Sequence, residues 1–451
     1  MKRILLIILP LLLATPGARA ELLAQAIWCA SNSTLYFDYC ETVTAGNTYS
    51  GQTVTKVYTV PTTTYAQTTD LGWQNENENV INAARTVVFT DAFKDFRPIS
   101  CKGWFKYFVS LTTITGISNL DTSEVTDMSY MFQQCKLETI DVNTFNVTHV
   151  TEASSMFLGC QQLTTIYCNQ TWSIASSPSM FENCSQLKGA TSYNFDNKNG
   201  DMANPINGYF TASLALSDDA SNADFLTTYN DYYGNITLNG RTLYKDGMWN
   251  TLCLPFDLTI SSSVLDGATI KVFDSSTWLA DDGTLTLKFT AAESTIEAGT
   301  PFIIKWTANN ENIVNPTFYG VTIKKDSEQT VVSYDGKVNF VAKFSPFNIT
   351  NDNIHDILFV GSNNKIGYSS APRTLRACCA HFLVPAGTNA KAVNKVEFLE
   401  DTSDTSAIIE VEADSQASRL SRWYTLDGVR MDSRPTTKGI FIHNGKKVVI
   451  R

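Results

Sequence analysis

Cysteine and histidine side chains are the groups of this chain best suited to hold a metal or to act as nucleophiles. The chain has ten cysteines and four histidines. No histidine has the spacing of a metal-binding helix or lies beside a nucleophile elbow; the four are His149, His355, His381 and His443. No glycine-rich phosphate loop is present either. We therefore expect no catalytic residue, no metal site, no cofactor and no enzymatic activity.

Three of the ten cysteines, Cys135, Cys160 and Cys184, follow a Met-Phe pair at the same interval. Equivalent positions in a repeat favour buried structural thiols that act as small hydrophobes. Two alternatives stay open: oxidising surroundings would permit disulfides, and thiolates can bind metal, although no Cys-x-x-Cys pair has zinc spacing. Cys378 and Cys379 are adjacent, a poor geometry for one metal or for a mutual bridge.

Acidic side chains number 44, and two short segments concentrate some of them, Asp352–Asp356 and Asp401–Asp404. Carboxylate oxygens of either segment could hold calcium, but neither segment has the spacing of an EF-hand loop, so solvated acidic loops are favoured. No motif points to a pair of carboxylates at glycosidase distance.

The three cysteines belong to a repeat that organises the middle of the chain. Met131-Phe132, Met156-Phe157 and Met180-Phe181 begin equivalent stretches, and these pairs are 25 and 24 residues apart. A fixed period in this range is typical of a solenoid, in which each unit buries its apolar face against its neighbours. The first and last units are degenerate, with Trp104-Phe105 in place of the first Met-Phe pair. We expect about four units over residues 98–211.

Each unit combines two patterns. Leu137-x-x-Ile140-x-Val142 has the leucine-rich spacing of a short strand that points alternate residues inward. Val125-x-x-Met128-x-x-Met131 has helical spacing, and Thr126-Asp127, like Thr151-Glu152 one unit later, would favour helix initiation. We therefore predict a strand plus a helical or 3₁₀ turn in each unit.

The outward strand positions form the candidate binding face. They are Thr112, Thr113, Thr115, Glu138, Thr139, Asp141, Thr164, Thr165 and Tyr167. Ordinary solvated strand residues are the alternative interpretation. Four rungs make a ladder only about 15–20 Å wide, which is small beside the roughly 800 Å² per partner of a standard interface. The repeats alone should bind weakly unless many copies supply avidity.

The flanking regions have their own signatures. Residues 1–20 have the charged start, short apolar core and small-residue end of a secretory signal peptide. Residues 21–97 are predicted to form a β-rich cap for the solenoid, with strands at 34–39, 55–60 and 86–90. The apolar run is too short to span a membrane, and we expect no transmembrane segment.

Beyond the repeats, residues 212–400 show short β-type runs between turn signals, and we predict an antiparallel, sandwich-like domain. The predicted strands are 285–289, 301–306, 338–341 and 357–360, and turns are expected at Asn239-Gly240, Asp282-Gly283 and Asp335-Gly336. Residues 401–418 are predicted to be a linker and 419–451 a small β module ending in a hairpin. The fold class is thus mainly β, with a short α/β leucine-rich-repeat-like solenoid.

The chain is acidic, with a formal charge of −10. Without residues 1–20 it would hold 31 Lys and Arg against 44 Asp and Glu, or about −13. An acidic surface repels phosphate backbones, so nucleic acid is not an expected partner.

The stretch Asn119-Leu-Asp-Thr-Ser-Glu-Val-Thr-Asp-Met128-Ser-Tyr-Met-Phe132-Gln-Gln-Cys135 resembles the BspA-type leucine-rich repeats of bacterial surface proteins. Residues 164–184 and 203–211 are similar to the end of such an array, and Gly247–Phe256 resembles a β module found beside these repeats. The resemblance covers roughly a quarter of the chain. It implies adhesion to host matrix proteins or to other bacteria, without naming the partner.

The end of the chain resembles a type IX secretion sorting tail. The matching segments are Trp423-Tyr-Thr-Leu-Asp-Gly428, Lys438-Gly-Ile-Phe-Ile442 and Gly445-Lys-Lys-Val-Val-Ile450. Such tails more often end in Lys, whereas this chain ends in Arg451. The resemblance implies export across an outer membrane and attachment to the cell surface.

Three hypotheses for function follow. The first is a secreted or surface-attached adhesin, on the extracellular face of the outer membrane, that contacts an extracellular protein or glycan through the repeat face. The second is glycan binding or processing by residues 212–400, where Trp249, Trp278 and Trp306 could stack on sugars unless they belong to the core. The third is a structural spacer of the cell envelope.

Overall fold

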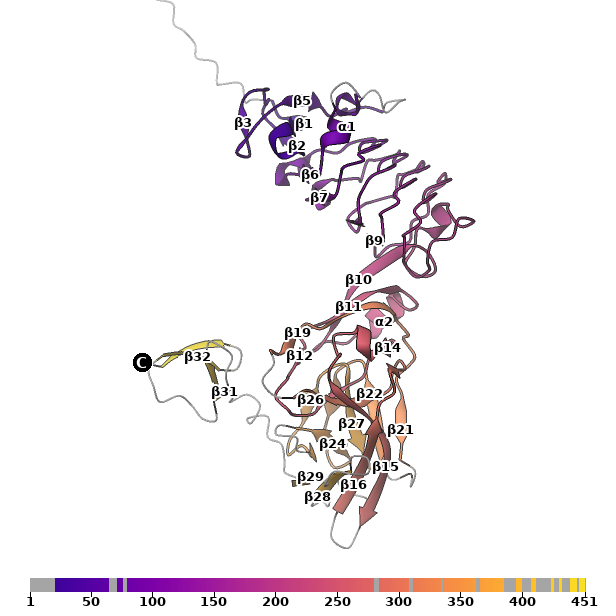
Figure 1. Cartoon of the computed structure of the whole chain (residues 1–451). Helices are drawn as coiled ribbons and strands as arrows, with labels where there is room; N and C mark the ends of the chain where they lie inside the picture. The colour runs from indigo at the N-terminus through magenta and orange to yellow at the C-terminus, as the bar shows by residue number, and fades with distance from the viewer. Residues whose placement is uncertain are drawn as a thin grey trace, which may run out of the picture. The chain divides into compact units, whose positions relative to one another are not determined.

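The computed structural model describes residues 21–64, 71–75, 79–279, 284–307, 311–333, 336, 338–361 and 366–384, and the backbone of six short segments between 395 and 450. The protein is mainly β, with 35% of residues in strands and 9% in helices. Residue contacts divide it into two units, 1–211 and 212–451 (Figure 1). The predicted signal peptide, residues 1–20, lies outside the described residues.

A five-stranded sheet opens the first unit, in the order β5-β1-β2-β6-β7. Its segments are rich in β-branched and aromatic residues, which suit a pleated, half-buried surface. The strands predicted at 34–39, 55–60 and 86–90 are confirmed. The bounds are β1 Leu23–Cys29, β2 Thr34–Cys40, β5 Lys56–Thr59, β6 Thr86–Phe89 and β7 Thr113–Thr115.

Short elements connect these strands. The hairpin of β3 and β4 covers a small apolar cluster around Ile27, Cys29 and Val54. The elements are η1 Ala30–Asn32, β3 Thr48–Tyr49, β4 Gln52–Thr53, η3 Gly72–Gln74, α1 Val80–Ala83 and η5 Asp91–Asp95.

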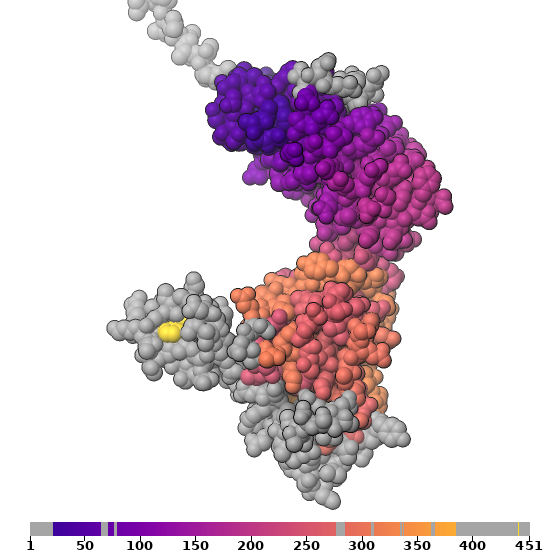
Figure 2. Space-filling model, viewed as in Figure 1, coloured from indigo at the N-terminus to yellow at the C-terminus, as the bar shows by residue number. Residues whose placement is uncertain are grey.

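Parallel pairing connects the repeats along the first unit. Strands β2, β6 and β7 are parallel, as are β8 (Thr139–Asp141), β9 (Thr165–Tyr167) and the start of β10 (Phe210–Ser217). A second line of parallel bridges joins Ser100, Asp127, Glu152 and Ser176 on another side of the repeats. Successive repeats therefore return to the same two lines. In Figure 2 the repeats, coloured violet to magenta, form one continuous body.

The predicted helical turn of each repeat is wrong. Between residues 98 and 211 the only helical elements are the 3₁₀ turns η6 (Ile117–Asn119) and η7 (Gly200–Met202). The backbone N–H of Met128 donates to Glu152 O at 2.8 Å, and that of Phe132 donates to Met156 O at 2.8 Å. These N–H groups point to the next repeat, so no helical ladder forms.

Residues with left-handed backbone interrupt the predicted helical turn twice in each repeat. Gly103, Tyr130, Ser155 and Ser179 form one column of positive φ, and Tyr107, Gln134, Gly159 and Asn183 form the other. Each such residue breaks the right-handed winding of the backbone, so a helix cannot continue through it. The apolar side chains still point inward at intervals like those of a helix. The predicted initiation site also has another role, because Asp127 Oδ1 accepts a hydrogen bond from Ser129 N at 2.8 Å.

The core of the first unit is a single cluster that extends from Ala24 to Phe210. Its centre is a column of stacked rings: the centroids of Phe105, Phe132, Phe157 and Phe181 are 5.6, 5.5 and 5.8 Å apart in turn. All four side chains are at most 1% exposed. Such offset ring pairs add to the gain from burying their area.

A ladder of thiols runs beside the ring column. Cys135 Sγ donates to Phe105 O at 3.1 Å, and Cys160 Sγ and Cys184 Sγ each donate to the Phe carbonyl of the preceding repeat at 3.0 Å. Burial raises the pKa of the Cys160 thiol to about 12. All ten cysteines are free thiols, so the prediction of structural thiols is confirmed for these three positions.

Side chains and loops satisfy the backbone groups at both ends of the repeats. At the first repeat, Trp73 Nε1 donates to Trp104 O at 2.8 Å, and Gln74 Nε2 donates to Gly103 O and Trp104 O at 2.9 and 2.8 Å. At the last repeat, the N–H groups of Ser179, Phe181 and Asn183 donate to Asn199 Oδ1, Lys198 O and Tyr193 Oη, each at 2.9 Å.

Gln74→Ala is expected to lower the free energy of unfolding of the first unit by about 1–3 kcal/mol, because it removes a buried donor from two buried carbonyls. Gln52→Ala, at a more accessible glutamine of the same unit, is the matched control and should change stability by less than about 0.5 kcal/mol. Urea unfolding followed by circular dichroism measures both. Equal effects of the two substitutions would contradict the capping role.

The second unit begins within β10, and residues 212–217 of that strand pair in parallel with β11 (Tyr233–Asn239). The helix α2 (Ala223–Thr228) lies between the two strands in the sequence. Strand β20 (Thr317–Thr322) then pairs antiparallel with β11. Pairing of β16 with β28 is also parallel. The predicted antiparallel pairing holds for most other strand pairs of the unit, but not for these two. The helix α2 provides the crossover that the parallel pair of β10 and β11 requires.

Two further sheets follow, in the orders β13-β18-β15-β16-β28-β29 and β21-β22-β27-β24-β25. The four predicted strands correspond to β16, β18, β22 and β24 and are confirmed. Their bounds are β13 Asn250–Leu252, β15 Thr269–Leu279, β16 Thr284–Ala291, β18 Phe302–Lys305, β21 Thr330–Val332, β22 Asn339–Lys343, β24 Ile357–Val360, β25 Ile366–Gly367, β27 Cys379–Leu383, β28 Lys395–Leu399 and β29 Ala407–Glu410.

Short two-stranded ribbons complete this part of the unit. Gly240 follows β11 with φ +85°, as the predicted turn requires, whereas Asp282-Gly283 and Asp335 lie outside the described residues. The remaining bounds are β12 Thr242–Leu243, β14 Leu258–Thr259, η8 Ile260–Ser262, β17 Thr295–Ile296, β19 Ile313–Val314, β23 Phe347–Ile349 and β26 Arg373–Leu375.

The C-terminal predictions have mixed outcomes. The predicted linker, 401–418, contains strand β29, which pairs with β28 through the β-branched run Ile408-Ile409; the rest of it lies outside the described residues. The predicted terminal hairpin is confirmed as β32 (Gly439–His443) paired with β33 (Lys446–Ile450). Strands β30 (Trp423–Thr425) and β31 (Arg430–Met431) complete that sheet.

The buried His381 is expected to make the stability of the second unit dependent on pH. Its side chain is 3% exposed and stacks on Phe347, and burial, with a smaller effect of Lys343, lowers its pKa from 6.5 to about 4. Below pH 6.5 the unfolded chain therefore binds a proton that the folded chain does not. The stability that neutral His381 contributes is fully present above pH 6.5, and about 3 kcal/mol of it is lost as the pH falls to 4.

The measurement is the urea midpoint between pH 7 and pH 4.5. His381→Gln should flatten the part of the curve that His381 causes, whereas His149→Gln, at an exposed histidine, should leave the curve unchanged. An unaltered slope in His381→Gln would contradict this assignment.

Candidate functional site

The predicted binding face lies on three short strands of the first unit. Thr113 and Thr115 are exposed on β7 and flank Ile114. On β8, Thr139 and Asp141 are exposed while Ile140 is buried, and Glu138 is exposed just before the strand. The inward and outward alternation is the one expected for a strand with one buried face. Thr112, which precedes β7, is also exposed.

The third strand offers less accessible side chains. Thr165 and Tyr167 on β9 are half-buried and pair with Thr139 and Asp141 of β8. Thr164 is half-buried as well, and its hydroxyl donates to Glu138 O at 3.0 Å. The hydroxyl of Thr164 is therefore already used within the fold, and Glu138, Thr139 and Asp141 are the most available groups of this pair of strands.

The face is divided between two sheets. Strand β7 pairs with β6, whereas β8 pairs with β9. Thr112, Thr113 and Thr115 therefore belong to one group of strands, and the other six face residues belong to the second. The register pairs Thr113 with Thr86 and Thr115 with Val88, both half-buried. Thr86 and Val88 thus extend the first group. The alternation of Thr86 and Val88 with Val87 and Phe89 is visible in the sequence, but the predicted face does not include it because the predicted cap covers residues 21–97.

Asparagine side chains hold the end of β8 and β9 in place. Asn143 N donates to Asp141 Oδ1 at 2.9 Å, and Asn143 Oδ1 accepts from Asn169 N at 2.7 Å in the next repeat. The carboxylate of Asp141 is therefore fixed by the turn that follows it. Of the face residues, Glu138 and Asp141 alone carry charge, so the second group presents hydroxyls and two carboxylates.

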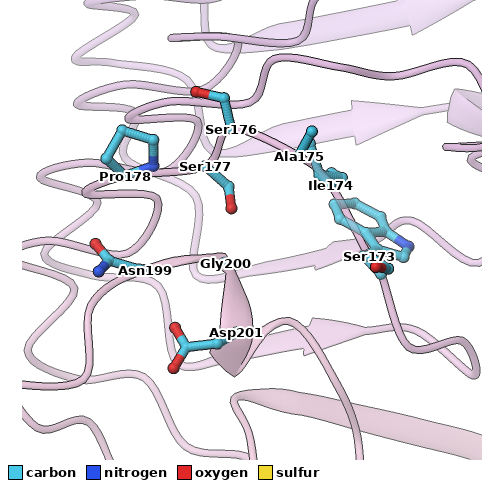
Figure 3. A pocket seen from close by; sticks show the side chains of 10 residues that line it. Ser173, Ile174, Ala175, Ser176, Ser177, Pro178, Asn199, Gly200 and Asp201 are labelled. Carbon is cyan, nitrogen blue, oxygen red and sulfur yellow. The ribbon is translucent and has the colours of Figure 1, made fainter.

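A pocket of about 560 Å³ lies at the last repeat (Figure 3). Ser177, Asn199 and Asp201 supply polar groups to it, and the Asn199 amide oxygen already accepts from Ser179 N. Gly200 allows the close approach of two segments, since a Cβ there would lie 2.1 Å from Ser177 Oγ. Asp201 is the one carboxylate in the lining, so the pocket lacks the second titratable group of an acid–base pair.

Among the described residues, the remaining sequence candidates contribute no site. Within the described part of the chain, no group of three His, Cys, Asp or Glu residues could hold a metal ion. Asp401–Asp404 lies outside the described residues. The side chains of Trp249 and Trp306 are 8% and 3% exposed, so both belong to the core and cannot serve as a sugar platform. The side chain of Trp278 lies outside the described residues.

The helices of the described residues include none that is both long and apolar enough to cross a bilayer.

Comparisons with known proteins give one match. Residues 100–215 match the model of a family described as "Mycoplasma protein of unknown function, DUF285". The match covers about a quarter of the chain and includes all three strands of the predicted face. Neither the curated proteins nor the solved structures compared with the chain include a match.

Proposed function

We propose that this chain is a non-enzymatic binding protein, an adhesin that contacts an extracellular protein through the strand face of its repeats. The observation that carries the proposal is the row of exposed side chains on β7 and β8, which stand on a fully buried core closed at both ends. Such a surface is held rigidly and presents its side chains without reorganisation, which favours recognition.

The proposal includes a fold assignment. The repeats form a short solenoid of the BspA-like, leucine-rich type, supported by parallel pairing on two lines and by a period of 24 to 27 residues between the left-handed columns. The second unit contains a sandwich, supported by a core cluster that joins Phe273 and Phe289 of β15 and β16 to Phe340 and Phe382 of β22 and β27.

The place of action follows from the chain's ends. The first 20 residues act as a signal peptide, and the last 30 or so act as a type IX sorting tail that leads to the outer-membrane surface. Support comes from the sequence patterns and from the four-stranded sheet of β30 to β33. Many copies on one cell would add avidity to weak single contacts.

Charge indicates the kind of protein partner. Glu138 lies just before Thr139 and Asp141 two residues after it, and both acids are exposed. The second group of the face therefore suits a partner patch rich in Lys and Arg. Rim charges of this kind act mainly on the association rate and lose effect as salt increases.

The test is adhesion of beads coated with the full mature chain to matrix proteins and to bacterial cells. Asp141→Lys should reduce adhesion severalfold. Glu124→Lys is the matched control, because Glu124 is an exposed acid in the same repeat but outside the strands. Adhesion no better than that of albumin-coated beads, or equal losses in both variants, would overturn the proposal.

The alternative, a glycan-binding or glycan-processing role for residues 212–400, loses its first support because Trp249 and Trp306 are buried. A third possibility, an envelope spacer, predicts no soluble partner and a loss of envelope integrity when the protein is deleted.

A further inference from the structure

The second unit has a groove of about 470 Å³ beside the helical turn η8 and the start of β20. Its volume is within the range of about 300–1,000 Å³ that holds small organic ligands. The lining consists of Ser262, Ser263, Val264, Ile313, Asn315, Pro316, Thr317 and Tyr319.

Among the described residues, Tyr319 has the most exposed large apolar side chain, at 71%. It stands on the edge strand β20, and its ring makes no recorded contact with another aromatic ring of the described residues. An aromatic ring held at the border of a groove offers an apolar face with a polar tip. A ligand that covers that face gains the free energy of burying its apolar area.

Asn315 supplies a fixed hydrogen-bonding group beside the ring. Its backbone N–H donates to Arg241 O at 2.8 Å, and its Oδ1 accepts from Gly240 N at 2.8 Å. These two bonds orient the amide, and no hydrogen bond from its Nδ2 is recorded among the described residues. The Nδ2 group is therefore a pre-positioned donor on an exposed side chain.

Hydroxyl groups complete the polar part of the lining. Thr317 Oγ1 lies 2.8 Å from Thr237 Oγ1, and Ser263 Oγ donates to Ile260 O at 2.9 Å, so each oxygen is held in place and retains accepting capacity. The lining holds no Asp, Glu, Lys, Arg or His. A charged ligand would find no counter-ion in this groove.

We propose that this groove binds a neutral sugar, with one face of a hexopyranose ring on Tyr319 and its hydroxyls on Asn315, Thr317 and the two serines. A pyranose has an apolar C–H face and a rim of hydroxyls, which matches one aromatic ring beside uncharged donors and acceptors. The absence of cationic lining residues, together with a chain charge of −10, disfavours sialylated and sulfated glycans.

The experiment titrates the full mature chain with neutral oligosaccharides of glucose, galactose, mannose and N-acetylglucosamine, and with a sialylated oligosaccharide, by calorimetry. Binding of at least one neutral sugar, and weaker or no binding of the sialylated one, is expected. Tyr319→Ala should weaken that binding roughly tenfold or more, whereas Tyr319→Phe should retain it within about threefold.

Tyr244→Ala is the matched control, since Tyr244 is 41% exposed in the same unit and does not line the groove. It should leave sugar affinity unchanged, as should Asp141→Lys in the first unit, which separates this proposal from protein adhesion. No binding of any neutral sugar, equal losses in Tyr319→Ala and Tyr244→Ala, or binding only of peptides would overturn it. Circular dichroism must show that each variant is folded.

Discussion

Phe157→Ala is expected to lower the free energy of unfolding of the first unit by about 3–5 kcal/mol. Phe157 is 1% exposed and its ring stacks on Phe132 at 5.5 Å and on Phe181 at 5.8 Å. Truncation would lose the transfer free energy of the ring and leave a cavity between two stacked neighbours. The repeats on either side cannot collapse into it, because backbone hydrogen bonds set their separation.

Hydrogen exchange over residues 128–163 measures this effect locally, because amides of the neighbouring repeats should lose protection together. Phe195→Ala is the control, since Phe195 is 56% exposed and should contribute less than about 0.5 kcal/mol. A change in exchange confined to residue 157 and its immediate neighbours would show that the ring column does not couple the repeats.

Arg241→Met should destabilise the second unit by about 3–5 kcal/mol. The Arg241 Nε atom lies 2.5 Å from Asp218 Oδ1, and the two side chains are 8% and 1% exposed. A further bond joins Arg241 to Ala377 O, while Arg376, itself 61% exposed, also pairs with Asp218. Removing Arg241 leaves a buried carboxylate with a single solvent-facing partner.

The double variant Arg241→Met with Asp218→Asn should recover part of that loss, because it removes the unpaired charge as well. Lys324→Met is the matched control: its 2.5 Å pair with Asp257 is half-exposed and should be worth at most about 1 kcal/mol. Thermal unfolding by calorimetry resolves the comparison. Losses of similar size in Arg241→Met and Lys324→Met would show that burial of the pair is not what matters.

Local composition was enough to place most strands. The runs at 285–289 and 357–360 are β-branched and aromatic between turn residues, and each became a strand of a sheet. The helical turn of the repeat was wrong, because an apolar pattern at intervals of three and four residues also fits stacked turns. Whether a helix or stacked turns form depends on the hydrogen-bond partners of the N–H groups, which lie about 25 residues away in the sequence. Gly159 and Asn183, at equivalent positions, were the available signal for left-handed backbone.

The candidate site depends more on distant pairing than the strands do. The exposure of Thr139 and Asp141 follows from simple alternation around Ile140. The division of the face between β7 and β8 does not, because it depends on which neighbour each strand pairs with. Tyr319 illustrates the same limit: its exposure arises from its place on an edge strand, and no local pattern distinguishes it from the buried Phe318 beside it.

The regular pattern of hydrogen bonds between repeats has an evolutionary consequence. Some N–H groups of a repeat donate to the next repeat, as Met128 N does to Glu152 O, and others donate to the repeat before, as Thr151 N does to Thr126 O. Residues outside this exchange close the two ends. A duplicated repeat would therefore find matching partners on both sides, whereas the loss of a single residue would misalign both columns of left-handed backbone. Gain or loss of whole repeats is thus a natural route by which related genes could vary the length of the exposed strand face while both closures stay the same.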